Sequence, residues 1–244
     1  MRIGIIGCGS IASEIISRNK NVVAVYDICP DKCKKFGIKI CGSVEELIEE
    51  SDLIIEAAST EAVKEYALKI IDSGKDLLIM SIGGLVDDEF RNKLFKKAYE
   101  KNVNIYLPSG AIGGLDIIKT AKVAGLNKVT IKSTKNAKTL GVVCKTRTRI
   151  FKGTAREAIK KFPKSTNVTV LLMIITGMDI EVEIYADPDI KYNVHEIHIE
   201  GEFGYADIII KNHPTPANPK TSYLAALSPI SILEHIDKKI LIGV

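Results

Sequence analysis

The chain has 244 residues, of which 46% are hydrophobic and 26% are charged. This composition excludes a disordered chain, which would be poor in apolar residues, and the length allows one large domain or two modest ones. The 34 basic and 30 acidic residues are interspersed, so the formal net charge of +4 gives no footprint for nucleic acid. No apolar run approaches the roughly 18 residues that a membrane span needs. We therefore expect neither nucleic acid nor a membrane as a partner.

The start of the chain and its residue usage bear on where the protein works. An apolar run follows Met1 and Arg2 without a cleavage-site pattern, which predicts a strand rather than a signal peptide and hence a cytoplasmic location. The sequence has no Trp and no Gln, and Lys and Glu dominate its charged residues. This bias is typical of thermophile proteins, although AT-rich codon usage also favours Lys.

Short apolar runs alternate with amphipathic stretches over the first 107 residues. The runs predict strands, and the stretches carry apolar residues at helical spacing. Ser43 followed by Glu46 fits a capping box at the start of one helix. The predicted strands are 3–6, 22–26, 53–57, 77–80 and 103–107, and the predicted helices are 11–18, 43–50, 61–73 and 87–101. Strands that alternate with helices in this way predict an α/β domain with a mainly parallel sheet.

The pattern changes after Pro108. Alternation of polar and apolar residues predicts strands, and one helix is predicted at 153–162. Residues 167–178 are ambiguous, because their β-branched content favours a strand and their length favours a helix. The predicted strands are 129–133, 180–185, 195–199 and 205–211, and a helix is predicted at 223–235 after a proline-rich connection. We expect a second α+β domain with a mainly antiparallel sheet over 108–212, and residues 213–244 returning to the first domain.

Residues 7–12, G-C-G-S-I-A, form a G-x-G-x-x-A motif between the first predicted strand and the first predicted helix. Gly7 permits the tight turn, Gly9 lets a pyrophosphate approach the backbone, and the helix N-terminus faces the phosphates. Asp27 ends the next strand, where a carboxylate binds the adenosine ribose. The alternative is an ordinary junction between a strand and a helix. The motif predicts a Rossmann dinucleotide-binding domain over 1–107, with cofactor contacts from Gly7, Gly9, Ser10, Ile11 and Asp27.

Asp27 also bears on which dinucleotide binds. A carboxylate at this place accepts hydrogen bonds from a free 2′-hydroxyl and repels a 2′-phosphate, so the sequence favours NAD over NADP. No Arg follows Asp27, but Lys32, Lys34 and Lys35 are near enough in sequence to reach a phosphate. NADP therefore stays possible.

Five cysteines, with no CxxC pair among them, stand at positions 8, 29, 33, 41 and 144. An odd number without that spacing argues against a disulfide framework and against a zinc ribbon. A metal cluster on Cys29, Cys33 and Cys41 would need a fourth ligand, and these spacings match no common site. We expect reduced, mostly buried thiols and no metal.

Two segments of the second half carry residues suited to chemistry. Residues 108–116, P-S-G-A-I-G-G-L-D, follow the last strand of the α/β region, and their glycines permit a flat ring to approach the backbone. A hinge between domains is the alternative. On a predicted strand, Asn193 and His195 point to one face and His198 to the other. Imidazole suits proton transfer near neutral pH, and a surface histidine on a strand is the alternative.

These motifs together resemble those of the L-aspartate dehydrogenase family. The resemblance rests on the glycine motif, P-S-G-A-I-G-G-L-D, F-P-K-S-T-N-V, A-D-P with N-x-H-E-I, G-E-F-G and N-P-K-T-S-Y-L-A-A-L-S, and it covers nearly the whole chain. It implies oxidation of L-aspartate by NAD or NADP to iminoaspartate. The imine can hydrolyse to oxaloacetate and ammonia or feed quinolinate synthesis on the way to NAD.

The resemblance also implies roles for particular residues. It makes His195 the catalytic residue, makes Ala111 and Asn167 contacts of the nicotinamide, and favours a helix at 167–178 and a homodimer. Residues 132–140, K-S-T-K-N-A-K-T-L, depart from the Arg-Lys-Pro-Pro-like run of many members, which puts in doubt an anion-binding role carried over to Lys135 or Lys138. Further candidates for substrate contact are Ser109, Gly110, Asn193 and Lys220.

Two other functions stay open. A related two-domain imine or semialdehyde reductase, similar to dihydrodipicolinate reductase or homoserine dehydrogenase, would share the Rossmann half, although the basic signature of the former is not found. A non-catalytic regulator that binds NAD would have no use for a histidine in its site. An exposed apolar face on the second sheet would favour a homodimer, in agreement with what the resemblance implies.

Overall fold

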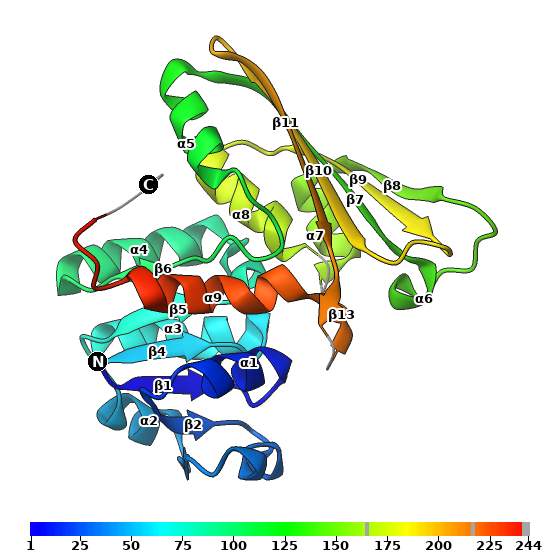
Figure 1. The fold of residues 1–244 in the computed structure, drawn as a ribbon. Coiled ribbons are helices and arrows are strands. Elements are labelled where there is room, and N and C mark those ends of the chain that lie inside the picture. The colour runs from blue at the N-terminus through cyan, green and yellow to red at the C-terminus, as the bar shows by residue number, and fades with distance from the viewer. Residues whose placement is uncertain (164–165, 216–217, 241–244) are drawn as a thin grey trace. The chain divides into compact units, whose positions relative to one another are not determined.

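The computed structural model describes residues 1–163, 166–215 and 218–240, and the chain divides into two compact units (Figure 1). Unit 1 comprises Met1–Pro108 and Pro229–Asp237, and unit 2 is built on Ser109–Ser228. The first boundary lies beside the expected one. The returning segment is shorter than expected, because residues 213–228 belong to unit 2.

Unit 1 contains a six-stranded sheet in the order β3-β2-β1-β4-β5-β6, and all neighbouring strands in it are parallel. This order is that of a Rossmann sheet. β1 and β4 are buried along their whole length, as expected for central strands of a parallel sheet covered on both faces. The strands are β1 (Ile3–Ile6), β2 (Val22–Tyr26), β3 (Lys39–Ile40), β4 (Leu53–Glu56), β5 (Asp76–Ile79) and β6 (Ile105–Tyr106).

Three helices of unit 1, α2, α3 and α4, begin at side chains that cap their first turn. Ser59 caps α3 and Asp87 caps α4, each by accepting a backbone N–H of the first turn. At α2 the predicted capping box is only half formed: Ser43 accepts the Glu46 N–H, but the Glu46 carboxylate accepts the Gly42 N–H. The helices are α1 (Ser10–Arg18), α2 (Val44–Glu50), α3 (Thr60–Asp72) and α4 (Asp88–Lys101).

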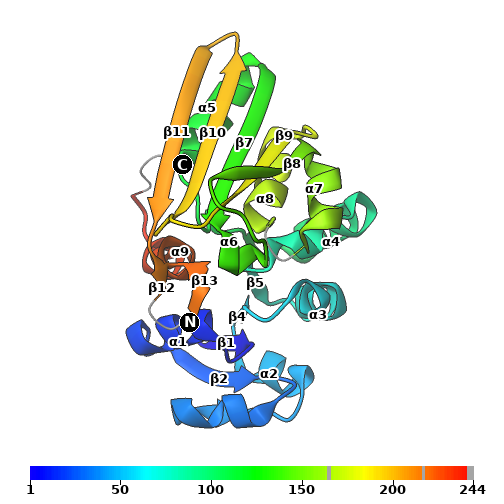
Figure 2. The same ribbon diagram turned by 90° about the vertical axis from the view of Figure 1, so that its right-hand side faces the viewer.

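Unit 2 contains a five-stranded mixed sheet in the order β11-β10-β7-β9-β8 (Figure 2). β7 and β9 are parallel, and the other three neighbouring pairs are antiparallel. The strands are β7 (Leu126–Asn136), β8 (Thr148–Thr154), β9 (Glu181–Asp187), β10 (Asn193–Gly201) and β11 (Gly204–Asn212), and β12 (Pro214–Thr215) pairs with β13 (Asn218–Ser222). The prediction of a mainly antiparallel second sheet is confirmed, although β8 had not been predicted.

Three helices of unit 2, α5 (Leu115–Ala124), α7 (Ala155–Lys161) and α8 (Asn167–Thr176), lie on one face of this sheet (Figure 1). The ambiguous segment is therefore a helix. α8 is buried almost all round its circumference, so its apolar residues show no periodicity that separates helix from strand. No element was predicted over residues 117–124, which form most of α5. The shorter α6 (Ala137–Leu140) follows β7, and α9 (Tyr223–His235) forms as predicted.

None of the helices in the described ranges is long and apolar enough to cross a lipid bilayer.

Candidate functional site

The glycine loop of unit 1 follows β1 and leads into α1. Gly7 has φ +98°, and a Cβ there would lie 2.7 Å from the Ala57 carbonyl oxygen, so both its conformation and its surroundings require glycine. A Cβ on Gly9 would meet no atom within 4 Å. Gly9 is also the N-cap of α1 and supplies no side chain to its N–H groups. The loop thus leaves open the space and the donors that a pyrophosphate needs.

Asp27, just after β2, lies beside this loop. One carboxylate oxygen accepts the Cys8 N–H at 2.9 Å, and the other accepts the Cys29 N–H at 2.8 Å. The Lys32 ammonium lies 4.0 Å from the carboxylate. Each carboxylate oxygen can accept a further hydrogen bond, so Asp27 is fixed in place and still able to bind a ribose hydroxyl.

A pocket of about 390 Å³ joins these residues within unit 1. Such a volume is in the range of small-molecule sites. Ser10 and Ile11 open α1, but they do not line this pocket. Its lining includes the predicted residues Gly7, Gly9 and Asp27, together with Cys8, Tyr26, Lys32, Ala57, Ala58, Ser59, Glu61 and Tyr66.

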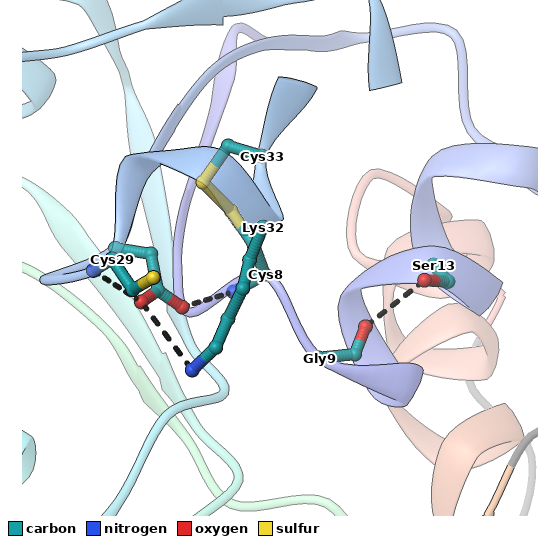
Figure 3. The surroundings of a disulfide bond; sticks show 7 residues. Cys8, Gly9, Ser13, Cys29, Lys32 and Cys33 are labelled. Carbon is teal, nitrogen blue, oxygen red and sulfur yellow. Dashed lines mark hydrogen bonds and ion pairs between the residues drawn. A yellow bond between two sulfur atoms is a disulfide. The ribbon is translucent and has the colours of Figure 1, made fainter. Parts of the chain in front are cut away.

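Cys8 and Cys33 form a disulfide bond, which corrects the expectation of reduced thiols throughout (Figure 3). The two residues are 25 positions apart, but β1 and β2 are parallel neighbours, so the segments that follow them meet at one edge of the sheet. Cysteine spacing alone does not contain this information. Because its sulfur is in the disulfide, Cys33 cannot act as a thiolate ligand to a metal together with Cys29 and Cys41. The described residues contain no group of three side chains able to hold one.

Glu56 is a residue of unit 1 that the sequence analysis missed. It ends β4 with 2% of its surface exposed and accepts hydrogen bonds from the N–H groups of Ala58, Ser59 and Ser81 and from the Ser81 hydroxyl. Burial raises the pKa of the Glu56 carboxyl. This side chain fixes the loops after β4 and β5, one of which lines the pocket. Its only sequence signal is a single acid at the end of an apolar strand.

His195 lies on the face of β10 that the helices of unit 2 cover, and only 2% of its surface is exposed. Its Nδ1 is 2.9 Å from the hydroxyl oxygen of Ser133 on the neighbouring strand β7. Burial, reinforced by the charge of Lys135, lowers the pKa of His195 to about 3. The imidazole is therefore neutral at physiological pH. His198 lies on the opposite face, as predicted, and its Nδ1 is 2.7 Å from the Asp207 carboxylate.

Two buried asparagines on the paired strands β10 and β11 each donate a hydrogen bond to a segment outside the sheet. Asn193 is buried and donates to the Ser222 hydroxyl at 3.1 Å. Directly opposite Asn193 on β11 is Asn212, which donates to the Ala111 carbonyl oxygen at 2.8 Å. The structure thus gathers His195, Asn193 and Ala111 within unit 2. It adds Ser133, Asn212 and Ser222, which the sequence analysis did not select.

Other predicted residues lie elsewhere or are described only in part. Ser109 and Gly110 form a half-buried turn beside Ala111. Asn167 is exposed at the first residue of α8. Lys220 belongs to β13, but its side chain is outside the described part of the chain. The roles predicted for these residues stay predictions.

Comparison with known proteins supplies the family. A family model described as aspartate dehydrogenase, C-terminal, matches residues 116–236, and one described as homoserine dehydrogenase, NAD binding domain, matches residues 7–108. The L-aspartate dehydrogenase of Methanospirillum hungatei is 41% identical over 251 residues and that of Methanocaldococcus jannaschii 38% over 265; in both cases the alignment covers 100% of this chain and 99% of the relative. The chain belongs to the L-aspartate dehydrogenase family.

Solved structures agree with this assignment. The aspartate dehydrogenase of Thermotoga maritima superposes with a TM-score of 0.85 at 30% identity, covering 100% of this chain and 99% of that one. A dihydrodipicolinate reductase from Paenisporosarcina superposes with a TM-score of 0.57 at 15% identity, which shows a shared fold alone. Of the functions left open by the sequence, the related reductases are therefore not favoured, and unit 1 of this family member binds NAD(P).

Proposed function

We propose that this protein oxidises L-aspartate to iminoaspartate with NAD or NADP. The observation that carries the proposal is the buried, neutral His195 fixed by Ser133 in a member of this family. Oxidation requires the substrate amino group to lose a proton before the Cα–H bond breaks, so the site needs a group that accepts a proton. A neutral imidazole held in one orientation is such a group.

The tautomer of His195 decides whether it can act. If the ring Nδ1–H donates to the Ser133 hydroxyl oxygen, the lone pair of Nε2 is free to accept the proton of the substrate ammonium, directly or through water. We assign this tautomer to the active protein. After oxidation, the imidazolium would release this proton to solvent, and the neutral imidazole could then accept a proton from the water that attacks the imine carbon. Hydrolysis of the imine gives oxaloacetate and ammonia.

The dinucleotide fits the residues of unit 1. Gly7 and Gly9 leave room at the open N-terminus of α1, and Asp27 has its carboxylate in the same pocket. Bound NAD(P) would take up the hydride from the substrate Cα. The backbone N–H groups on Asp27 hold its carboxylate where a free 2′-hydroxyl binds best, which supports NAD, and Lys32 in the pocket keeps NADP possible.

The test is the His195→Ala variant in purified protein, with aspartate and NAD, followed as absorbance of the reduced cofactor. General acid–base groups contribute about 10²–10⁴-fold to the rate, so turnover should decrease by a factor of about 10²–10⁴. His198→Ala is the matched control, because this histidine lies on the same strand and faces the other way. Turnover of His195→Ala within about threefold of wild type would contradict the role of His195. A panel of semialdehydes and cyclic imines separates the proposed function from that of a related reductase.

We further propose a cytoplasmic homodimer. An apolar face on the second sheet would favour a dimer, but the uncovered face carries mainly charged and polar side chains, among them Lys128, Lys132, Glu181, Glu183 and Asp207. Two apolar side chains of β11 are exposed on this same face, Tyr205 at 73% and Ile209 at 61%. Light scattering of the purified protein measures the assembly, and a monomeric mass at micromolar concentration would exclude the dimer.

A further inference from the structure

We propose that Lys135 is the cation that binds a carboxylate of the substrate, next to His195. This inference rests on the proposed function for the identity of the substrate, but the requirement for an anion comes from the protein itself. The sequence alone does not indicate which of Lys135, Lys138 and Lys220 binds a substrate carboxylate.

The strand register brings Lys135 to the histidine. Ser133 and Lys135 are two residues apart on β7, so their side chains leave the same face of the sheet. Ser133 lies opposite His195 on the antiparallel strand β10, and continuing that register by two residues along β7 brings Lys135 level with Asn193. The ammonium is close enough to His195 for its charge to lower the pKa of the imidazole.

Lys135 also lacks a counter-charge among the described residues. No ion pair or hydrogen bond of its ammonium occurs within that part of the chain, and burial lowers its pKa to about 8. Two basic side chains of β8, in the same sheet, do have carboxylate partners: Arg149 lies 3.6 Å from Glu183, and Lys152 lies 3.3 Å from Glu181. A partly buried ammonium with no partner costs folding free energy. Its presence beside His195 is explained if an anion completes the site.

The substrate supplies that anion. Aspartate has two carboxylates and one ammonium, so a site for it needs cations or N–H donors for at least one carboxylate. When a carboxylate binds at Lys135, its charge stabilises the ammonium, and the repulsion that Lys135 exerts on His195 is offset. The basicity of His195 therefore rises when the substrate is in place, which is when a proton acceptor is needed. Lys138 is exposed on α6 and does not share this surrounding.

The first experiment separates binding from proton transfer. In Lys135→Met, we expect the KM for aspartate to rise about 10- to 100-fold, the range for losing a hydrogen bond to a charged group. The kcat and the KM for NAD should stay within about threefold, and Lys135→Arg should recover part of the loss. Lys132→Met is the matched control, because Lys132 lies on the same strand with its side chain on the opposite, solvent-facing side. A fall in kcat at unchanged KM would instead make Lys135 a base and overturn the proposal, as would unchanged kinetics.

The second experiment does not depend on turnover. Succinate has both carboxylates but no amino group, so calorimetric titration of succinate measures anion binding alone. Binding should weaken at least tenfold in Lys135→Met and not in Lys132→Met. If wild type binds succinate through Lys135 but does not oxidise aspartate, the proposed function fails and this inference stands. If aspartate is oxidised and Lys135→Met binds succinate as wild type does, the inference fails alone.

Folding of the variant is itself informative. Removing an unpaired, partly buried charge should leave the melting temperature of the empty protein unchanged or raise it. A Lys135→Met protein that melts well below wild type would mean that the ammonium has a structural partner, and the proposal would be overturned. Lys135→Gln, which keeps a polar head without the charge, should weaken succinate binding to a similar extent.

Discussion

In unit 1 a carboxylate lines the pocket with both oxygens already bonded to backbone N–H groups, whereas in unit 2 a histidine and a lysine lie together without a carboxylate between them. The first arrangement is complete in the empty protein and presents an acceptor to a neutral hydroxyl. The second is incomplete, because its charge is compensated only when an anion binds. The two units therefore differ in how their sites affect stability. The hydrogen bonds that hold Asp27 stabilise unit 1 without a ligand, whereas the charge of Lys135 in unit 2 is compensated only by a bound anion.

The largest expected effect comes from the Cys8–Cys33 disulfide of unit 1. It closes a loop of 25 residues, and the loop-entropy model gives about 3–4 kcal/mol for a ring of this size. Cys33→Ser, or reduction with a dithiol, should lower the free energy of unfolding by about that amount and weaken NAD binding, because the Cys8 N–H holds Asp27. Cys29→Ser is the control, since this thiol is exposed and free. Equal denaturation midpoints for Cys33→Ser and wild type would show that the disulfide does not stabilise unit 1.

The two glycines of the loop should separate stability from binding. Gly7→Ala forces a side chain against the Ala57 carbonyl at positive φ and should cost about 1–3 kcal/mol of folding free energy. Gly9→Ala meets no atom in the empty protein, so the melting temperature should hold while the Kd for NAD rises about tenfold or more. Thermal melts and fluorescence titration with NADH measure both. A Gly9→Ala protein that binds NADH as wild type does would mean that the pyrophosphate does not approach this backbone.

Asp27→Ser tests whether the pre-bonded carboxylate recognises the ribose. We expect NAD affinity to fall about 10- to 100-fold, the range for losing a hydrogen bond to a charged acceptor, and the preference for NAD over NADP to narrow. Titration of both dinucleotides against wild type and variant gives the ratio. Unchanged NAD affinity would show that Asp27 is not the ribose ligand.

A further expected effect, confined to acidic solution, is a dependence of stability on pH that arises in unit 2. The pKa of His195 is lowered to about 3 in the folded state, against an ordinary value of 6.5, so the unfolded chain binds a proton in this window that the folded one does not. Stability should therefore fall as pH drops from 6.5 toward 3. In His195→Asn, the melting temperature should decline less steeply over this range. Identical slopes would mean that folding does not lower the pKa of His195.

Features formed by residues close together in the sequence could be predicted, whereas contacts between residues far apart in the sequence could not. The glycine loop and Asp27 are local signals around one strand–helix–strand unit, and they meet in one pocket. His195 was found by residue type and strand alternation. Ser133 hydrogen-bonds to His195 across 62 residues, and Asn212 to Ala111 across 101, so no local pattern marks them. Such pairs depend on sheet order, which the sequence pattern left undetermined.

The same reason explains the errors. Cys8 and Cys33 pair because their strands are neighbours, a fact that spacing rules for cysteines do not include. β8 was not predicted because its residues lack clear alternation between buried and exposed positions, and no helix was predicted at α5.

The placement of residues 229–237 in unit 1 has a consequence for biosynthesis. Residues 1–108 of unit 1 are synthesised before unit 2, whereas residues 229–237 are synthesised after residues 109–228 of unit 2. During translation, the six-stranded sheet of unit 1 can pair early, since all of its strands precede residue 108, but the unit is not whole until residues 229–237 have been added. Domains generally fold in the order in which they emerge. Here the nascent chain must instead keep an unfinished first unit while the whole of the second is made.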